Sequence, residues 1–257
     1  YIRVNAIDME MADMFNGNVY VTSMSYMTPD NSSARLYLYL VEEDNCIAEY
    51  TINYKKTHSQ TLVPMLDEVS QMIELDLSSI DAIAVAAGPG SFTGLRIGLA
   101  TAEAMAYSWQ CLLHGVDTLK ALAYNIPLEG FIISPVLDAQ KGNYYQALYQ
   151  WQEGKLVELA ATEVVNKDRL LERIVEFGMP ALILGECKKL EKVELPANVK
   201  LAPKTFLMPK ASSVALLAEV EFDPEADKKI FGLEPYYIRR SEAEELWEER
   251  QKKLQQQ

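Results

Sequence analysis

The stretch of sequence that decides the fold is Ala86-Ala87-Gly88-Pro89-Gly90-Ser91-Phe92-Thr93-Gly94-Leu95-Arg96. The apolar run that leads into it, residues 82–87, is typical of a buried strand. The strand must end at the bend, because Pro89 cannot donate a ladder hydrogen bond and the glycines on either side of it allow a sharp reversal. Ser91 is a favoured N-cap residue. We therefore predict a strand over 82–87 that turns directly into a helix over 91–109.

The predicted helix carries a row of small residues at four-residue spacing, formed by Gly94, Gly98, Ala102 and Ala106. An interior glycine costs a helix roughly 1 kcal/mol relative to alanine, so the row indicates that another backbone approaches closely. Helices that are apolar almost all round are usually buried. The close neighbour is therefore either a sheet of the same chain or a helix of a partner protein.

A glycine bend that opens a helix can also hold a phosphate on its free N–H groups. A dinucleotide fingerprint, however, requires glycine at the position of Thr93. A Walker A loop requires a Lys-Ser/Thr pair directly after its last glycine, where this chain has Leu95-Arg96. The spacing argues against both kinds of nucleotide loop.

The motif from Gly88 to Gly98, followed by Ala102 and Ala106, resembles the signature of the TsaB (YeaZ) family. The resemblance covers most of the chain from about residue 35 onward and includes residues 138–142 and 235–239. It implies the α/β fold of the actin-like ATPases (ASKHA, ribonuclease H-like). The family-motif residues are His58, Ser59, Gly88, Pro89, Gly90, Ser91, Thr93, Gly94 and Arg96.

The resemblance also implies a function. TsaB proteins are non-catalytic partner subunits that bind and support the TsaD-like enzyme, which forms N6-threonylcarbamoyladenosine next to the anticodon of tRNAs reading codons that begin with adenine. A TsaE-like ATPase is implied as a third partner, with a homodimer when the chain is alone and tRNA contacted only through the complex. We expect no cofactor on this chain alone, and ATP and a metal ion on the partner subunits.

We expect two helices, over 57–73 and 91–109, to lie side by side and to receive two helices of the partner. Their apolar faces exceed what one sheet can cover, and the family resemblance points to the same two helices. The residues expected at this interface are Met65, Val69, Met72, Gly94, Gly98, Ala102, Met105 and Ala106.

Composition restricts the classes of function. The 257 residues carry a formal net charge of −13, which argues against a surface that holds nucleic acid alone, although an acidic excess also serves solubility. The three cysteines have no C-x-x-C spacing and predict neither a disulfide framework nor a zinc site. No apolar run reaches the roughly 20 residues that span a bilayer. We expect a cytoplasmic protein that does not enter membranes.

The order of predicted elements recurs, as strand, strand, strand, helix, strand, helix. In the first half these are 2–7, 35–41, 46–54, 57–73, 82–87 and 91–109, and in the second half 131–137, 144–151, 156–165, 167–177, 181–184 and 212–220. A helical stretch over 117–125 joins them. We expect subdomains over 1–115 and 116–240 and a charged helix or tail over 241–257. Residues 9–34 are atypical for the family and hold a short extra strand over 18–23.

Actin-like ATPases hold phosphates on two glycine-containing turns that each open with an aspartate. The corresponding turns here, Asp8-Met9-Glu10 and Asp138-Ala139-Gln140, lack that glycine, so we expect weak nucleotide binding at most. Alignment with the metal-binding histidine pair of TsaD places Thr118 and Leu122 at the two positions. Neither side chain is a useful metal ligand.

Two further pairs have a catalytic and a structural interpretation. His58-Ser59 resembles part of a hydrolase triad, but Ser59 as a helix N-cap with His58 just outside the helix explains the pair better, and the sequence has no G-x-S-x-G elbow. Asp138 and Lys141 form either an acid–base pair or a polar turn. The alternative functions are a stand-alone metallopeptidase-like or kinase-like enzyme of the actin-like fold, and a homodimeric module without an enzyme partner.

Overall fold

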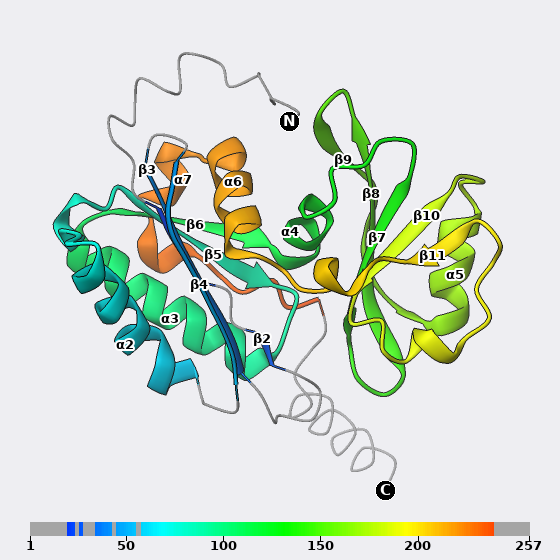
Figure 1. Ribbon diagram of the computed structural model, residues 1–257, viewed down its shortest axis with the longest axis horizontal. Coiled ribbons are helices and arrows are strands. Elements are labelled where there is room, and N and C mark those ends of the chain that lie inside the picture. The colour runs from blue at the N-terminus through cyan, green and yellow to red at the C-terminus, as the bar shows by residue number, and fades with distance from the viewer. Residues whose placement is uncertain (1–19, 24–25, 28–33, 43–44, 55–57, 239–257) are drawn as a thin grey trace, which may run out of the picture.

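The computed structural model describes residues 20–23, 26–27, 34–42, 45–54 and 58–238. In this part of the chain two sheets lie side by side, each flanked by helices (Figure 1). Three predicted features lie outside the described residues: the strand over 2–7, the turn Asp8-Met9-Glu10 and the charged helix or tail over 241–257.

The first sheet is mixed. Its strands within the described residues are β1 (Tyr20–Ser23), β2 (Tyr26–Met27), β3 (Ala34–Glu42), β4 (Asn45–Tyr54), β5 (Ala82–Gly88) and β6 (Leu112–Asp117). Strand β3 pairs antiparallel with β4 and β1, β1 pairs parallel with β5, and β5 pairs parallel with β6. Strand β2 pairs antiparallel with the start of β3.

The second sheet repeats this arrangement. Its strands are β7 (Ile132–Asp138), β8 (Asn143–Gln152), β9 (Lys155–Asn166), β10 (Ala181–Gly185) and β11 (Val199–Leu201). The order β9-β8-β7-β10-β11 has the same directions as β4-β3-β1-β5-β6, because β7, β8 and β9 pair antiparallel and β7, β10 and β11 pair parallel. The predicted duplication is therefore confirmed at the level of the strands.

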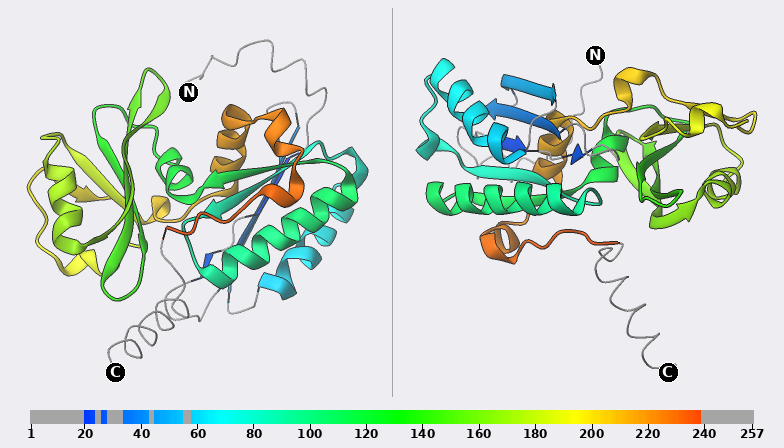
Figure 2. Two further views of the ribbon diagram at one scale, coloured as in Figure 1. Left: turned by 180° about the vertical axis from the view of Figure 1, so that it is seen from behind. Right: turned by 90° about the horizontal axis from the view of Figure 1, so that it is seen from below.

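Helices cover both faces of each sheet. They are α2 (His58–Met72), α3 (Phe92–Trp109), α4 (Thr118–Tyr124), α5 (Lys167–Val175), α6 (Ala211–Glu221) and α7 (Pro224–Asp227), with 3-10 turns at Leu77–Ser79, Leu190–Lys192, Lys204–Phe206 and Ile230–Gly232. Helices α2 and α3 pack on one face of the first sheet and α6 on the other. Helix α4 packs on one face of the second sheet and α5 on the other (Figure 2).

Strand β5 shows why the first sheet needs both layers of helices. Each of its seven residues is buried, as is typical of a strand that has neighbours on both edges and helices on both faces. Ile83 and Val85 point toward α2 and α3, while Ala82, Ala84 and Ala86 point toward α6. Alternate residues therefore belong to opposite cores.

The predicted order of elements is wrong in two places. Strand β1 lies between β3 and β5, so the run predicted as an extra strand over 18–23 supplies the first strand of the sheet. In the second half the strand β10 is not followed by a helix. Residues 186–198 contain only the turn Leu190–Lys192, and the strand β11 comes next. Helix α6 follows β11 and packs on the first sheet. Strand β11 was not predicted, because a three-residue strand carries no measurable period. The subdomain boundaries at 115/116 and 240/241 stay a prediction.

Side-chain caps fix most helix starts. Ser91 accepts from the Gly94 amide, Asp117 from the Lys120 amide and Asn166 from the Arg169 amide, as their positions before helical runs predict. Helix α2 begins at His58, so Ser59 lies inside the helix and is not its N-cap. No helix in the described part of the chain is long and apolar enough to cross a membrane.

Candidate interaction surface

The row of small residues on α3 faces the chain's own sheet. Gly94, Gly98, Ala102 and Ala106 are all buried. Ala102 and Ala106 pack in one cluster with Ile83 of β5. Of the two neighbours that the sequence allows, the structure therefore selects the sheet.

Seven of the eight residues predicted at a partner interface are core residues. Met65, Val69 and Met105 are buried together with the small row, and Met72 alone is exposed. A side chain that is fully covered by its own chain cannot contact a partner without rearrangement. Of the predicted set, only Met72 is available for a partner in this conformation, and the interface itself stays a prediction.

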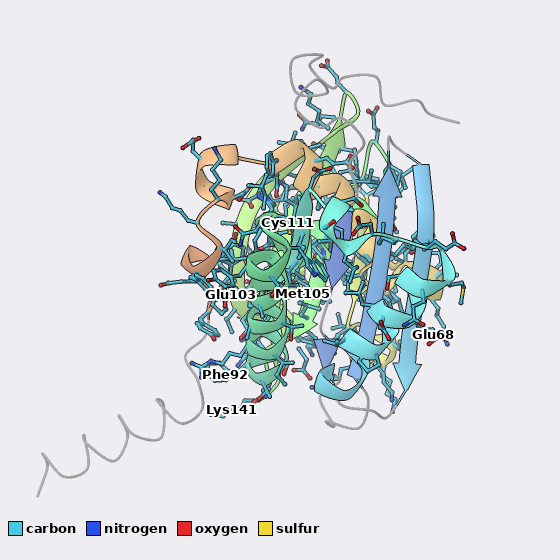
Figure 3. The ribbon with its side chains drawn as sticks, turned by 90° about the vertical axis from the view of Figure 1, so that its left-hand side faces the viewer. Glu68, Phe92, Glu103, Met105, Cys111 and Lys141 are labelled. Atoms are coloured by element: carbon cyan, nitrogen blue, oxygen red, sulfur yellow. The ribbon has the colours of Figure 1, made fainter. Side chains whose placement is uncertain are left out.

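The outward side of α2 and α3 carries the predicted Met72 together with apolar residues that sequence reasoning missed. Figure 3 shows the two helices side by side, with Met105 on the side of α3 toward α2 and Glu103 on the opposite side. Val63, Met72 and Tyr107 are 54%, 67% and 58% exposed. Their exposed neighbours Pro64, Ala100 and Ala104 are small or apolar. We call Val63, Pro64, Met72, Ala100, Ala104 and Tyr107 the α2/α3 surface.

The glycine bend receives the C-terminal part of the described chain. Gly88 has φ +124°, and its peptide bond to Pro89 is cis. The Tyr236 amide donates to the Ala87 carbonyl at 2.8 Å. A Cβ atom on Gly88 would lie 3.0 Å from the Tyr236 carbonyl oxygen. The bend thus serves the close approach of another backbone segment. This segment belongs to the stretch 235–239 that the family resemblance includes, which we call the second motif.

Side chains join the same two motifs. The Arg96 guanidinium lies over the Phe92 ring at 4.1 Å and its Nε donates to the Tyr237 hydroxyl at 3.1 Å. The Phe92 and Tyr237 ring centroids are 5.1 Å apart. Motif residue Thr93 is exposed beside them. The resemblance named both motifs, but only the fold shows that they touch.

The turn between β7 and β8 uses its own amides. The Ala139 amide donates to the Asn143 carbonyl, and the Gln140 amide donates to an Asp138 carboxylate oxygen at 2.8 Å. The other Asp138 oxygen accepts from Lys189 Nζ at 2.6 Å. Asp138 is therefore bonded both within its own turn and to Lys189, which lies outside the turn.

A charged cluster lies between the first sheet, α4, α6 and α7. His114 Nδ1 is 2.9 Å from Asp227 Oδ2, and Lys120 pairs with Glu221. Burial lowers the pKa of His114, but the carboxylates of Glu221 and Asp227 outweigh this effect and raise it above its usual range. Burial raises the pKa of the nearby Asp117 to about 6. These groups hold the surrounding elements together.

Metal ligands and thiols are the remaining candidates for chemistry among the described residues. They contain no group of three or more His, Cys, Asp and Glu side chains placed to hold a metal ion. Burial raises the pKa of the Cys111 and Cys187 thiols to about 11 and about 12, so neither is a nucleophile at neutral pH. A groove of about 510 Å³ on α5 lies away from both motifs and is lined by Asp168, Leu171, Glu172, Val175, Glu176 and Pro196.

Known proteins resemble this chain in sequence and fold. The family model "TsaD: tRNA N6-adenosine threonylcarbamoyltransferase" matches residues 45–247. The tRNA threonylcarbamoyladenosine biosynthesis protein TsaB of Bacillus subtilis is 34% identical over 89% of this chain and 100% of its own length. The Escherichia coli protein of the same name is 27% identical over 73% of this chain and 83% of its own length.

Solved structures agree with this relationship at the level of the fold. A Pseudomonas aeruginosa protein described as similar to peptidase YeaZ has a TM-score of 0.72 at 21% identity, covering 86% of this chain and all of that one. YeaZ from Pseudomonas aeruginosa has a TM-score of 0.65 at 20% identity, covering 85% of this chain and all of that one. Together with the matches in sequence, these folds show that the chain belongs to the TsaB (YeaZ) family and has its actin-like α/β fold.

Proposed function

We propose that this chain is a non-catalytic partner subunit that binds and supports the TsaD-like enzyme forming N6-threonylcarbamoyladenosine in tRNA. The main support for the proposal is membership of the TsaB family, because relatives that match 89% and 73% of this chain are named for this pathway. The TsaD-like subunit supplies the chemistry, and this chain supplies a docking surface.

The α2/α3 surface is the docking site that the geometry favours. It exposes Met72 and Tyr107, large apolar side chains of the kind that is enriched in interfaces. Ala100 and Ala104, which precede Tyr107 on α3, are small and exposed, which allows a partner helix to approach closely. We also expect a homodimer when the chain is alone, and a TsaE-like ATPase as a third component of the complex.

Three observations support a role without catalysis. Thr118 and Leu122, at the positions aligned with the TsaD histidine pair, are buried in the fold. The amides of Ala139 and Gln140, in the turn that opens with Asp138, donate within the turn and so do not face a phosphate. The net charge of −13 opposes the binding of tRNA by this chain alone. ATP, the metal ion and tRNA are therefore held by the partner subunits or by the complex.

Titration calorimetry of the purified chain with the TsaD-like subunit of the same organism tests the proposal. We expect Met72→Glu to weaken binding by about tenfold or more, equivalent to ~1.4 kcal/mol, because a charge would be buried against apolar atoms. Val220→Glu is the matched control: Val220 is also 67% exposed but lies on α6, on the opposite face of the first sheet. Both variants should unfold near the wild-type temperature.

Three results would contradict the proposal. The first is absence of binding by the wild-type chain. The second is equal binding by Met72→Glu and Val220→Glu, which would place the interface elsewhere. The third is turnover of ATP or of model peptides by the chain alone, which would favour the enzyme alternative.

A further inference from the structure

The C-terminal part of the described chain wraps around the edge strand β6. On one face of the sheet, Asp227 at the end of α7 contacts His114 of β6. On the other face, Leu233 covers the next residue: a Cβ atom on Gly115 would lie 2.5 Å from Leu233 Cδ1. Because consecutive strand residues point to opposite faces, the chain crosses the sheet edge between residues 227 and 233. We call residues 228–238 the strap.

The strap is seated along α3 by contacts at several points. Ile230 and Leu233 pack against the core beneath α2 and α3. The Tyr236 amide donates to the Ala87 carbonyl, and the Tyr237 ring packs on that of Phe92. Figure 2 shows the strap running beside α3, and in Figure 3 Phe92 and Glu103 lie on that side of the helix.

Although it is held in place, the strap exposes large apolar side chains. Phe231 is 70% exposed, and Tyr236, Tyr237 and Ile238 are exposed as well. The Phe231 ring centroid lies 5.6 Å from that of Tyr107, a residue of the α2/α3 surface. The α2/α3 surface therefore extends onto the strap through the contact of these two rings. Exposed apolar patches of this kind mark interaction sites in soluble proteins.

We propose that the strap is part of the docking surface and that the partner seated on α2 and α3 also packs on Phe231 and the neighbouring strap residues. This inference rests on the proposed function, because it names the same TsaD-like partner. Continuity through Tyr107 and Phe231 selects that partner, since a protein that covers one of these rings must also approach the other.

The anchor of the strap lies where this partner cannot touch it. Asp227 and His114 are on the α6 face of β6, with Glu221 and Lys120 beside them. Asp227 also accepts from the Asp223 amide at 3.0 Å and so fixes the loop that leads into α7. A change at Asp227 alters the seating of the strap without changing any residue of the α2/α3 surface.

Two variants test the strap at its surface and at its anchor. Phe231→Ala removes the exposed ring, and Asp227→Asn removes the charge that faces His114. We expect Phe231→Ala to bind the TsaD-like subunit about tenfold more weakly, as is typical of a buried aromatic anchor. Asp227→Asn should bind several-fold more weakly and exchange the amide hydrogens of residues 228–238 faster. Val220→Ala, exposed on α6, should bind like the wild type.

The comparison with Met72→Glu separates the two proposals. If Met72→Glu weakens binding and Phe231→Ala does not, the strap lies outside the interface and the proposed function stands. If neither variant weakens binding, both proposals fail. If Phe231→Ala changes only self-association of the chain, the occupant is a second copy and the inference is wrong. Phe231 is largely exposed, so its truncation should leave the chain folded even if Asp227→Asn does not.

Discussion

The two halves of the molecule share a strand order but differ after β5 in the first half and after its counterpart β10 in the second. In the first half, β5 leads through the glycine bend into the 18-residue helix α3 before the fifth strand begins. In the second half, β10 leads through residues 186–198, which form only one short 3-10 turn. Strands β6 and β11 are counterparts, and so are the helices that follow them, α4 and α6. Helix α3 has no counterpart among the described residues.

This difference coincides with the features on which the proposed docking depends. Shared features such as strand order maintain the fold in both halves. The glycine bend, the α2/α3 surface and the strap all gather around the helix that one half lacks. Function is argued from such a site and not from the fold itself.

The largest effect is expected at the glycines that end the counterpart strands β5 and β10. Gly88 and Gly185 both have positive φ, but a Cβ atom on Gly185 would lie 2.2 Å from the Val136 carbonyl oxygen of β7, a strand that cannot move away. We expect Gly185→Ala to lower the free energy of unfolding by at least about 3 kcal/mol. Gly88→Ala should cost less, because its neighbour is the strap. Chemical denaturation measures both.

Gly178→Ala is the control for this pair. Gly178 also has positive φ, yet nothing lies within 4 Å of a Cβ atom built on it. Its cost should therefore be limited to backbone strain, roughly 1–2 kcal/mol. Equal losses for Gly178→Ala and Gly185→Ala would show that the close contact with Val136 is unimportant.

Much of this comparison is predictable from the sequence. Alternation of apolar residues and the turns between them locate β3, β4, β5, β7, β8, β9 and β10 to within a few residues. The positions of Ser91 and Asn166 before helical runs predict two of the caps. These features depend on local chain geometry, which the local sequence determines.

The sequence predictions fail where contacts between residues far apart in the chain determine the structure. The period of α3 shows that its small row packs closely on something, but it does not distinguish the chain's own sheet from a partner. The contact of Arg96 with Tyr237 joins residues 141 positions apart, and no spacing rule connects them. The exposed residues Ala100, Ala104 and Tyr107 follow the same helical period on the other face, so they could have been identified by asking which face remains after the core face is assigned.

The second prediction compares the counterpart helices α4 and α6. Helix α4 is preceded by the half-buried N-cap Asp117, whereas Lys210, which precedes α6, makes no side-chain cap. Burial raises the pKa of Asp117 to about 6, so the folded chain keeps a proton that the unfolded chain has lost between about pH 4 and pH 6. Stability from this group must therefore fall as the pH rises through that range, by up to about 3 kcal/mol.

Asp117→Asn isolates this contribution, because asparagine retains the cap without the charge. We expect the variant and the wild type to unfold with similar free energies near pH 4, and the variant to be more stable at pH 7. Urea denaturation at several pH values makes the measurement, and the shared titration of other carboxylates cancels in the difference. A difference that does not change with pH would contradict the assigned pKa shift.

The smallest effect is expected on α3, the helix without a counterpart, and it tests whether α3 belongs to the core of the first half. Ala102 is fully buried on the sheet side of α3, and Ala104 is exposed on the outward side of the same helix. Ala102→Leu must displace well-packed neighbours, and we expect it to lower the free energy of unfolding by about 1–3 kcal/mol. Ala104→Leu should change the free energy of unfolding by less than about 0.5 kcal/mol, but should weaken binding of the TsaD-like subunit by blocking close approach to the α2/α3 surface.

Thermal unfolding and calorimetry on both variants separate the two faces of α3. If Ala102→Leu leaves stability unchanged while it weakens binding, the small row faces the partner after all, and the assignment of α3 to the core of the first half is wrong.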